Sequence, residues 1–106
     1  MKRKYKLYCE CKNEGDRRKI LREVTGCFPE YTVYDTTGVY KGAMEASIVV
    51  ELITESEHAD IDLLQISKWI CCKFDQECVL VTCENNIHAC EIGASGIVNQ
   101  GDTDGE

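Results

Sequence analysis

The chain lacks long apolar runs and has few basic side chains, and both absences exclude classes of function. No apolar stretch approaches the roughly 20 residues that a membrane-spanning helix needs, which excludes a membrane protein. The N-terminal residues also lack the apolar core of a secretory signal, so we expect the eight cysteines to be reduced in a cytoplasm. With 19 acidic and 12 basic residues the formal charge is −7, which does not suit a protein that binds nucleic-acid phosphates.

Hydrophobic periodicity predicts a small α+β fold. Apolar and polar residues alternate in the first segment, as in a half-buried strand, whereas apolar residues recur every three to four positions in two later segments, as in helices. Asn13 and Asp16 have the spacing of an N-terminal helix cap, and Ser56 is expected to cap the second helix. The expected order is a strand at 4–11, a helix at 13–26, strands at 31–34 and 46–54, a helix at 57–74 and a strand at 78–83.

This order predicts a ferredoxin-like βαββαβ arrangement. The first and last strands should be antiparallel neighbours, with Tyr5 near Cys83, and both helices should cover one face of an antiparallel sheet. The other face must then meet water or a partner. Residues 87–92 form a possible extra C-terminal edge strand. We expect one domain over residues 1–92 and a disordered acidic tail at 93–106, whose apolar content is too low to offset its ordering entropy.

Three segments, 31–42, 45–52 and 76–82, resemble small ferredoxin-like proteins that bacteriophages and other mobile elements encode. Small acidic proteins of that group include anti-CRISPR inhibitors of type II RNA-guided nucleases. The resemblance therefore implies a non-enzymatic interaction protein, cytoplasmic in a bacterial host, that binds a host nucleic-acid enzyme such as an RNA-guided nuclease. Such a protein would block nucleic-acid loading without contacting nucleic acid itself. The matched residues are hairpin and core positions, and no catalytic residue is carried over.

Acidic side chains and two tyrosines are the candidate partner-binding residues. Carboxylates on a rigid domain can occupy the basic clefts of nucleic-acid enzymes, and tyrosines often anchor protein interfaces. Two simpler interpretations stay open: the carboxylates complement a solvated helix N-terminus, and the tyrosines only stabilise the hairpin. The candidates are Tyr34, Asp35, Tyr40, Glu45, Glu51, Glu55, Glu57, Asp60 and Asp62.

Cys83, His88 and Cys90 form the candidate metal site. A tight hairpin that pairs Cys83 with His88 would place Cys90 diagonally across on the same face, and tetrahedral zinc binds thiolates and imidazoles. Cys9 or Cys11, expected on the neighbouring strand, would complete a structural zinc site. The competing interpretation is core packing, because free cysteines are among the most buried residues.

Other interpretations of the reactive residues also stay open. Cys27 and His58 are alternative fourth zinc ligands. Cys90 and His88 could form a nucleophile and base, but we find no orienting residue, oxyanion hole or glycine-rich phosphate loop, so we do not expect an enzyme. The alternative function is a small-molecule-binding regulatory domain, with the ligand at the connection 35–42.

If the hairpin thiols and His88 hold a structural zinc, the purified protein should carry about one zinc per chain. Cys90→Ser and His88→Ala should each remove the metal, because each substitution deletes a ligand. Elemental analysis of untagged protein measures the zinc content. Full zinc content in both variants would contradict this site.

Overall fold

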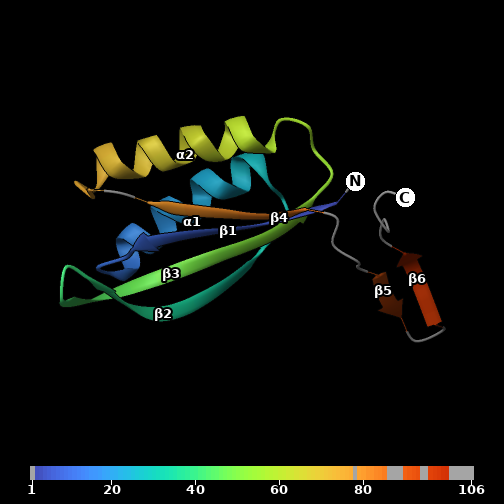
Figure 1. The fold of residues 1–106 in the computed structure, drawn as a ribbon, viewed down its shortest axis with the longest axis horizontal. Coiled ribbons are helices and arrows are strands. Elements are labelled where there is room, and N and C mark those ends of the chain that lie inside the picture. Colours follow the sequence, from blue (N-terminus) through green and yellow to red (C-terminus); the bar gives the residue numbers. More distant parts are fainter. Residues whose placement is uncertain (1, 78, 86–89, 94–95, 101–106) are drawn as a thin grey trace.

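The computed structural model describes residues 2–77, 79–85, 90–93 and 96–100, and its elements follow the predicted order (Figure 1). One antiparallel sheet has the strand order β2-β3-β1-β4, which confirms the predicted ferredoxin-like arrangement. The elements are β1 (Arg3–Glu10), α1 (Glu14–Cys27), β2 (Thr32–Tyr40), β3 (Ala43–Thr54), α2 (Ala59–Lys73), β4 (Leu80–Asn85), β5 (Cys90–Gly93) and β6 (Gly96–Gln100).

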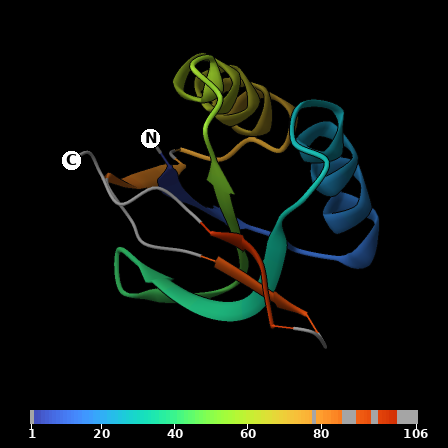
Figure 2. The same cartoon turned by 90° about the vertical axis from the view of Figure 1, so that its right-hand side faces the viewer.

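Both helices lie on the same side of this sheet (Figures 1 and 2). Tyr5, Leu7 and Cys9 of β1 face the helices and are buried, because alternate side chains of a strand point to opposite faces. The side chains between them, including Tyr8 and Glu10, lie on the helix-free side, which we call the open face. The predicted neighbour relation is also confirmed, since Tyr5 is the register partner of Cys83. The core is completed by Ile20, Val24, Phe28, Ile48, Val50, Leu52, Ala59, Leu63, Ile66 and Ile70.

The two helices begin differently. The side chain of Asn13 accepts a hydrogen bond of 2.8 Å from the backbone N–H of Asp16, so the predicted cap of α1 is confirmed. The predicted cap of α2 is wrong. Ser56 Oγ accepts from the N–H of His58 at 3.2 Å within a turn, and α2 begins only at Ala59. Neither helix of the described segments combines the length and apolar character needed to cross a membrane.

The β2–β3 hairpin is longer and tighter than expected. We expected a connection over residues 35–45, but strand pairing continues to Tyr40 and Ala43, and only Lys41 and Gly42 form the turn. Both turn residues have positive φ, 51° and 81°, as in the two-residue turns that match strand twist. β2 is visibly curved along its length (Figure 2). The predicted ligand-binding loop at 35–42 is therefore mostly strand.

The C-terminal strands form a sheet of their own. β5 pairs with β6 in a two-stranded sheet, whereas we expected an extra strand at the edge of the main sheet. Residues 96–100 have strand geometry within the segment that we expected to be disordered. Residues 101–106 lie outside the described residues, and the division into a domain at 1–92 and a tail at 93–106 stays a prediction.

We expect Gly42→Ala to lower the free energy of unfolding by about 1–2 kcal/mol, because alanine disfavours the left-handed φ at this position. An added Cβ would meet no atom within 4 Å, so the cost is conformational and not steric. Gly26→Ala is the matched control: it lies in α1 with equally open space, and there alanine should stabilise by up to about 1 kcal/mol. Urea unfolding followed by circular dichroism measures both, and equal effects would contradict the turn conformation.

Candidate active site

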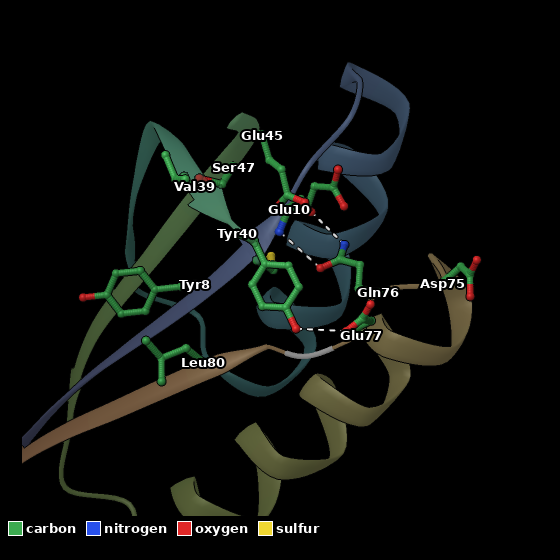
Figure 3. Close-up of a pocket in the computed structure, with 12 residues that line it drawn as sticks. Tyr8, Glu10, Val39, Tyr40, Glu45, Ser47, Asp75, Gln76, Glu77 and Leu80 are labelled. Carbon is green, nitrogen blue, oxygen red and sulfur yellow. Dashed lines mark hydrogen bonds between the residues drawn. The ribbon is translucent and has the colours of Figure 1, made fainter. Parts of the chain in front are cut away.

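A pocket of about 390 Å³ lies on the open face, between the tip of the β2–β3 hairpin and the connection from α2 to β4 (Figure 3). All four strands of the main sheet contribute to it, so it depends on the complete sheet. Its lining residues are Tyr8, Cys9, Glu10, Gly38, Val39, Tyr40, Glu45, Ser47, Asp75, Gln76, Glu77 and Leu80.

The two-residue period of the strands brings these side chains together. Glu10 is the register partner of Ser47, and Tyr8 is the partner of Leu80. Gly38 stands opposite Glu45 in the hairpin, where a Cβ would lie 3.4 Å from the Ser47 hydroxyl. Because Gly38 has no side chain, part of the pocket beside Glu45 stays open.

The connection after α2 is held against β1 by Gln76. Asp75, with φ of 55°, turns the chain out of the helix, and the backbone N–H of Gln76 donates to the carbonyl of Cys71 at 3.1 Å. The Gln76 side chain accepts from the N–H of Glu10 at 3.1 Å and donates to its carbonyl at 2.8 Å. This paired contact fixes one wall of the pocket.

Glu77 joins that connection to the hairpin tip. Its Oε1 accepts a 2.9 Å hydrogen bond from the Tyr40 hydroxyl and lies 3.0 Å from Lys41 Nζ. Lys41, and next Tyr40, hold the pKa of the Glu77 carboxyl below its ordinary value. The pair is exposed to solvent, so it contributes little to stability. The contact matters for the shape of the pocket, because it joins the α2–β4 connection on one side to the hairpin tip on the other.

The pocket is acidic and has aromatic walls. Glu10, Glu45, Asp75 and Glu77 all line it. Glu45 is half-buried and forms no hydrogen bond or ion pair with another residue of the described ranges. Carboxylates attract cations, and tyrosine rings stabilise organic cations over their faces. The lining therefore suits a small organic cation with an aromatic or apolar part.

Only two of the predicted partner-binding residues, Tyr40 and Glu45, line this pocket. Tyr34 and Glu51 share the open face farther along the hairpin, where a hydrogen bond to Glu51 raises the pKa of Tyr34. The other predicted residues are scattered over the molecule. Asp35 pairs with Arg17 at 3.2 Å, Glu55 with Lys2 at 3.7 Å, and Asp60 with Arg3 at 3.6 Å and with the Tyr5 hydroxyl. Glu57 precedes α2, and Asp62 lies in its first turn. These residues do not form the single acidic surface that we expected.

The described strands also separate the predicted zinc ligands. Cys9 and Cys11 are buried. Cys83 is exposed and pairs with Tyr5, four positions and about 13 Å along β1 from Cys9. Zinc–ligand bonds are only about 2.0–2.3 Å long, so neither Cys9 nor Cys11 can share a metal with Cys83 in this arrangement. Cys9 and Cys11 therefore do not converge with Cys83 in the described strands, and the zinc site as a whole stays a prediction.

The remaining zinc ligands are not tested. His88 lies outside the described residues, and Cys90 is described only in its backbone. Cys27 ends α1 and His58 precedes α2. The described residues contain no cluster of three or more candidate ligands, and zinc stays a prediction.

The thiol of Cys9, which lines the pocket, is protonated at neutral pH. Burial, and next the neighbouring Cys11 and Cys71, raise its pKa from 9.0 to about 12. Burial also raises the pKa values of Cys11 and Cys27. A nucleophilic or redox thiol needs the opposite shift. The pocket therefore does not use Cys9 as a thiolate.

The chain matches the model of the S-adenosylmethionine lyase family over residues 6–103. It belongs to this family. Two solved structures are similar in fold to this family member. A phage SAM lyase in complex with S-methyl-5′-thioadenosine is 19% identical with a TM-score of 0.59, over 78% of this chain and 80% of that chain. The de novo designed protein Foldit4 is 18% identical with a TM-score of 0.54, over 82% of this chain and 100% of the other. No curated protein sequence matches the chain.

The family overturns the predicted function. The expectations of a non-enzymatic protein, of an anti-CRISPR inhibitor and of a nuclease partner are wrong, because the family is one of lyases that act on a small molecule. The regulatory-domain alternative fails for the same reason. The resemblance to small phage proteins holds in this coarser form, since the similar lyase is a phage protein.

Several pocket residues were not predicted from the sequence. Tyr8, Glu10, Gln76 and Glu77 carried no catalytic motif, yet all line the pocket. The segments that carried the resemblance, interpreted as hairpin and core, also contain Gly38, Tyr40 and Glu45. Polar residues at alternate positions of the uncovered sheet face were the available signal.

We expect Cys9→Ala to make the free energy of unfolding fall less steeply as the pH rises from about 9 toward 12. A thiol in the unfolded chain ionises near its ordinary pKa, whereas folded Cys9 keeps its proton to about 12, so wild-type stability falls across this range. Urea unfolding at several pH values under reducing conditions measures the slope. Thr37→Ala, at an exposed position of β2 without a titratable group, is the control and should keep the wild-type slope. Equal slopes in both variants would contradict the raised pKa.

Proposed function

We propose that the protein is an S-adenosylmethionine lyase that releases S-methyl-5′-thioadenosine. The match to the lyase family over residues 6–103 carries this proposal. The acidic, tyrosine-lined pocket supports it, because S-adenosylmethionine carries a sulfonium and an ammonium cation. The similar phage structure contains S-methyl-5′-thioadenosine, which is the thioether that such a cleavage would leave.

The proposed reaction breaks the bond between the sulfonium sulfur and the methionyl Cγ. The bonding electron pair goes to sulfur, which becomes a neutral thioether. The substrate's own carboxylate oxygen attacks Cγ in the same step, as the bond to sulfur breaks, and closes a five-membered lactone, so atoms and charge balance without water. Elimination would instead need a strong base, because the Cβ protons are not adjacent to a carbonyl. Carboxylates are in general weak bases, and this favours internal displacement.

The displacement neutralises a positive and a negative charge of the substrate, so its rate depends on the polarity of the surroundings. The reacting sulfonium and carboxylate of the substrate become two neutral groups, and water stabilises the charged reactant more than the transition state. Apolar and aromatic walls lower that cost. Tyr8, Tyr40 and Leu80 provide such walls in the pocket. The protein's contribution is then mainly to fold the substrate so that carboxylate and Cγ meet.

The carboxylates have a different task from the walls. A carboxylate beside the sulfonium would stabilise the reactant, so its best use is to bind the cationic ammonium, which keeps its charge throughout the reaction. Glu45 is our candidate because it is half-buried and beside the hollow left by Gly38. Glu77 holds the Tyr40 ring at the opposite wall through the hydrogen bond to its hydroxyl.

The predicted cytoplasmic location in a bacterial host belongs to the same proposal. It is supported by the eight cysteines, since a protein this rich in thiols fits a reducing compartment. Cys9, Cys11, Cys27, Cys72 and Cys83 form no disulfide with another described residue.

Incubation of the protein with S-adenosylmethionine should yield S-methyl-5′-thioadenosine, measured by liquid chromatography. Glu45→Gln should lower kcat/KM by about ten- to a hundred-fold, which corresponds to losing a charged hydrogen bond. Glu57→Gln removes the same charge from an exposed position outside the pocket and should leave kcat/KM unchanged. Absence of the thioether product would overturn the function. Equal activities of the two variants would overturn the role of Glu45.

Substrate deuterated at Cβ separates the two reaction routes. Internal displacement keeps both deuterons in the four-carbon product, whereas elimination loses one. The undeuterated lactone and alkene have the same formula, so only the deuterium label separates the two routes by mass. Mass spectrometry of the four-carbon product measures the number of deuterons retained. Loss of one deuteron would overturn the displacement route while leaving lyase activity established.

A further inference from the structure

The contact between Gln76 and Glu10 lies just beyond the end of the β1–β4 pairing. Among the described residues the pairing of β1 with β4 ends at Tyr8 and Leu80, so no described residue of β4 pairs with Glu10. The Gln76 carboxamide takes that place, with one donor and one acceptor facing the peptide groups of Glu10. A side-chain amide thus extends the sheet by one more pair of hydrogen bonds. Both bonds are partly buried, which strengthens them against competition from water.

This contact lies beside the contact between Glu77 and Tyr40 at the edge of the pocket (Figure 3). Gln76 holds β1, and the next residue, Glu77, holds Tyr40 and Lys41 at the hairpin tip. The connection between α2 and β4 therefore spans the pocket edge from β1 to the hairpin. The contacts of Glu77 with Tyr40 and Lys41 are exposed and therefore weak. They form only if the α2–β4 connection holds Glu77 close to the hairpin tip. Gln76 holds the connection in that position through its two hydrogen bonds to β1.

We propose that Gln76 is a positioning residue of the lyase site, which fixes Glu77 and through it the Tyr40 wall of the pocket. This inference rests on the proposed function, because it assigns to Gln76 the placement of the Tyr40 wall that would enclose the substrate. Gln76 acts on the hairpin tip through Glu77. A displacement reaction depends steeply on how the substrate is folded, so a wall that moves lowers kcat more than it raises KM.

A double-mutant cycle tests this route. Gln76→Met keeps the size of the side chain but removes both hydrogen bonds, and should lower kcat by about ten-fold with a smaller change in KM. In a Glu77→Ala background the same substitution should cost less than about two-fold, because the route through Glu77 is already absent. Gln65→Met, at an exposed position of α2, is the matched control and should keep wild-type kinetics. Fully additive losses, or no loss in Gln76→Met, would overturn the proposal.

A second measurement does not depend on turnover. In substrate-free protein, Gln76→Met should speed hydrogen exchange at the Glu10 amide by about ten-fold or more, since that amide loses its acceptor. It should also shift the Tyr40 ring signals in NMR spectra in the same direction as Glu77→Ala. Unchanged Tyr40 signals would overturn the positioning role even if the protein cleaves S-adenosylmethionine. If the shifts occur but no cleavage is found, the proposed function fails and the coupling of Gln76 to Tyr40 stands.

Discussion

The position of β1 in the middle of the sheet is the constraint on which the rest of the structure depends. It pairs with β3 on one side and β4 on the other, so every side chain of β1 must point to one of two faces. Tyr5, Leu7 and Cys9 fill the core beneath the helices. Tyr8 and Glu10 face the pocket. A shift of one residue in register would exchange the core for the pocket lining, and hydrophobic burial prevents that shift.

The carboxylates of this protein have different effects depending on whether they lie on the surface or in the pocket. Spread over the surface, carboxylates such as Asp35 and Glu55 pair with nearby basic side chains in weak, exposed contacts. In the pocket, several carboxylates gather around tyrosine rings with Lys41 as a neighbouring cation. Negative potential concentrated in a hollow recognises a small cation, whereas the same charges dispersed over the surface do not.

Much of the fold could be predicted because local periodicity and capping, such as the Asn13 cap, define the elements. Their order then implies the ferredoxin-like topology, in which Tyr5 pairs with Cys83. The hairpin was predicted too short, because Gly38 was interpreted as a loop residue although it lies within β2. The enzyme was missed for a chemical reason. In the proposed reaction the substrate supplies both nucleophile and leaving group, so the protein needs no triad, metal motif or phosphate loop that spacing in a sequence would reveal.

The order of the elements, the buried face of each strand and the negative charge follow from side-chain chemistry within a few residues, so the amino-acid sequence predicts all three. Which residues share the pocket depends instead on tertiary packing. Glu10 and Gln76 are far apart in the chain and meet because β1 and the end of α2 are packed against the same core. Tyr40 and Glu77 meet for the same reason, across the hairpin tip and the α2–β4 connection. Such contacts depend on the complete sheet, and no local pattern encodes them.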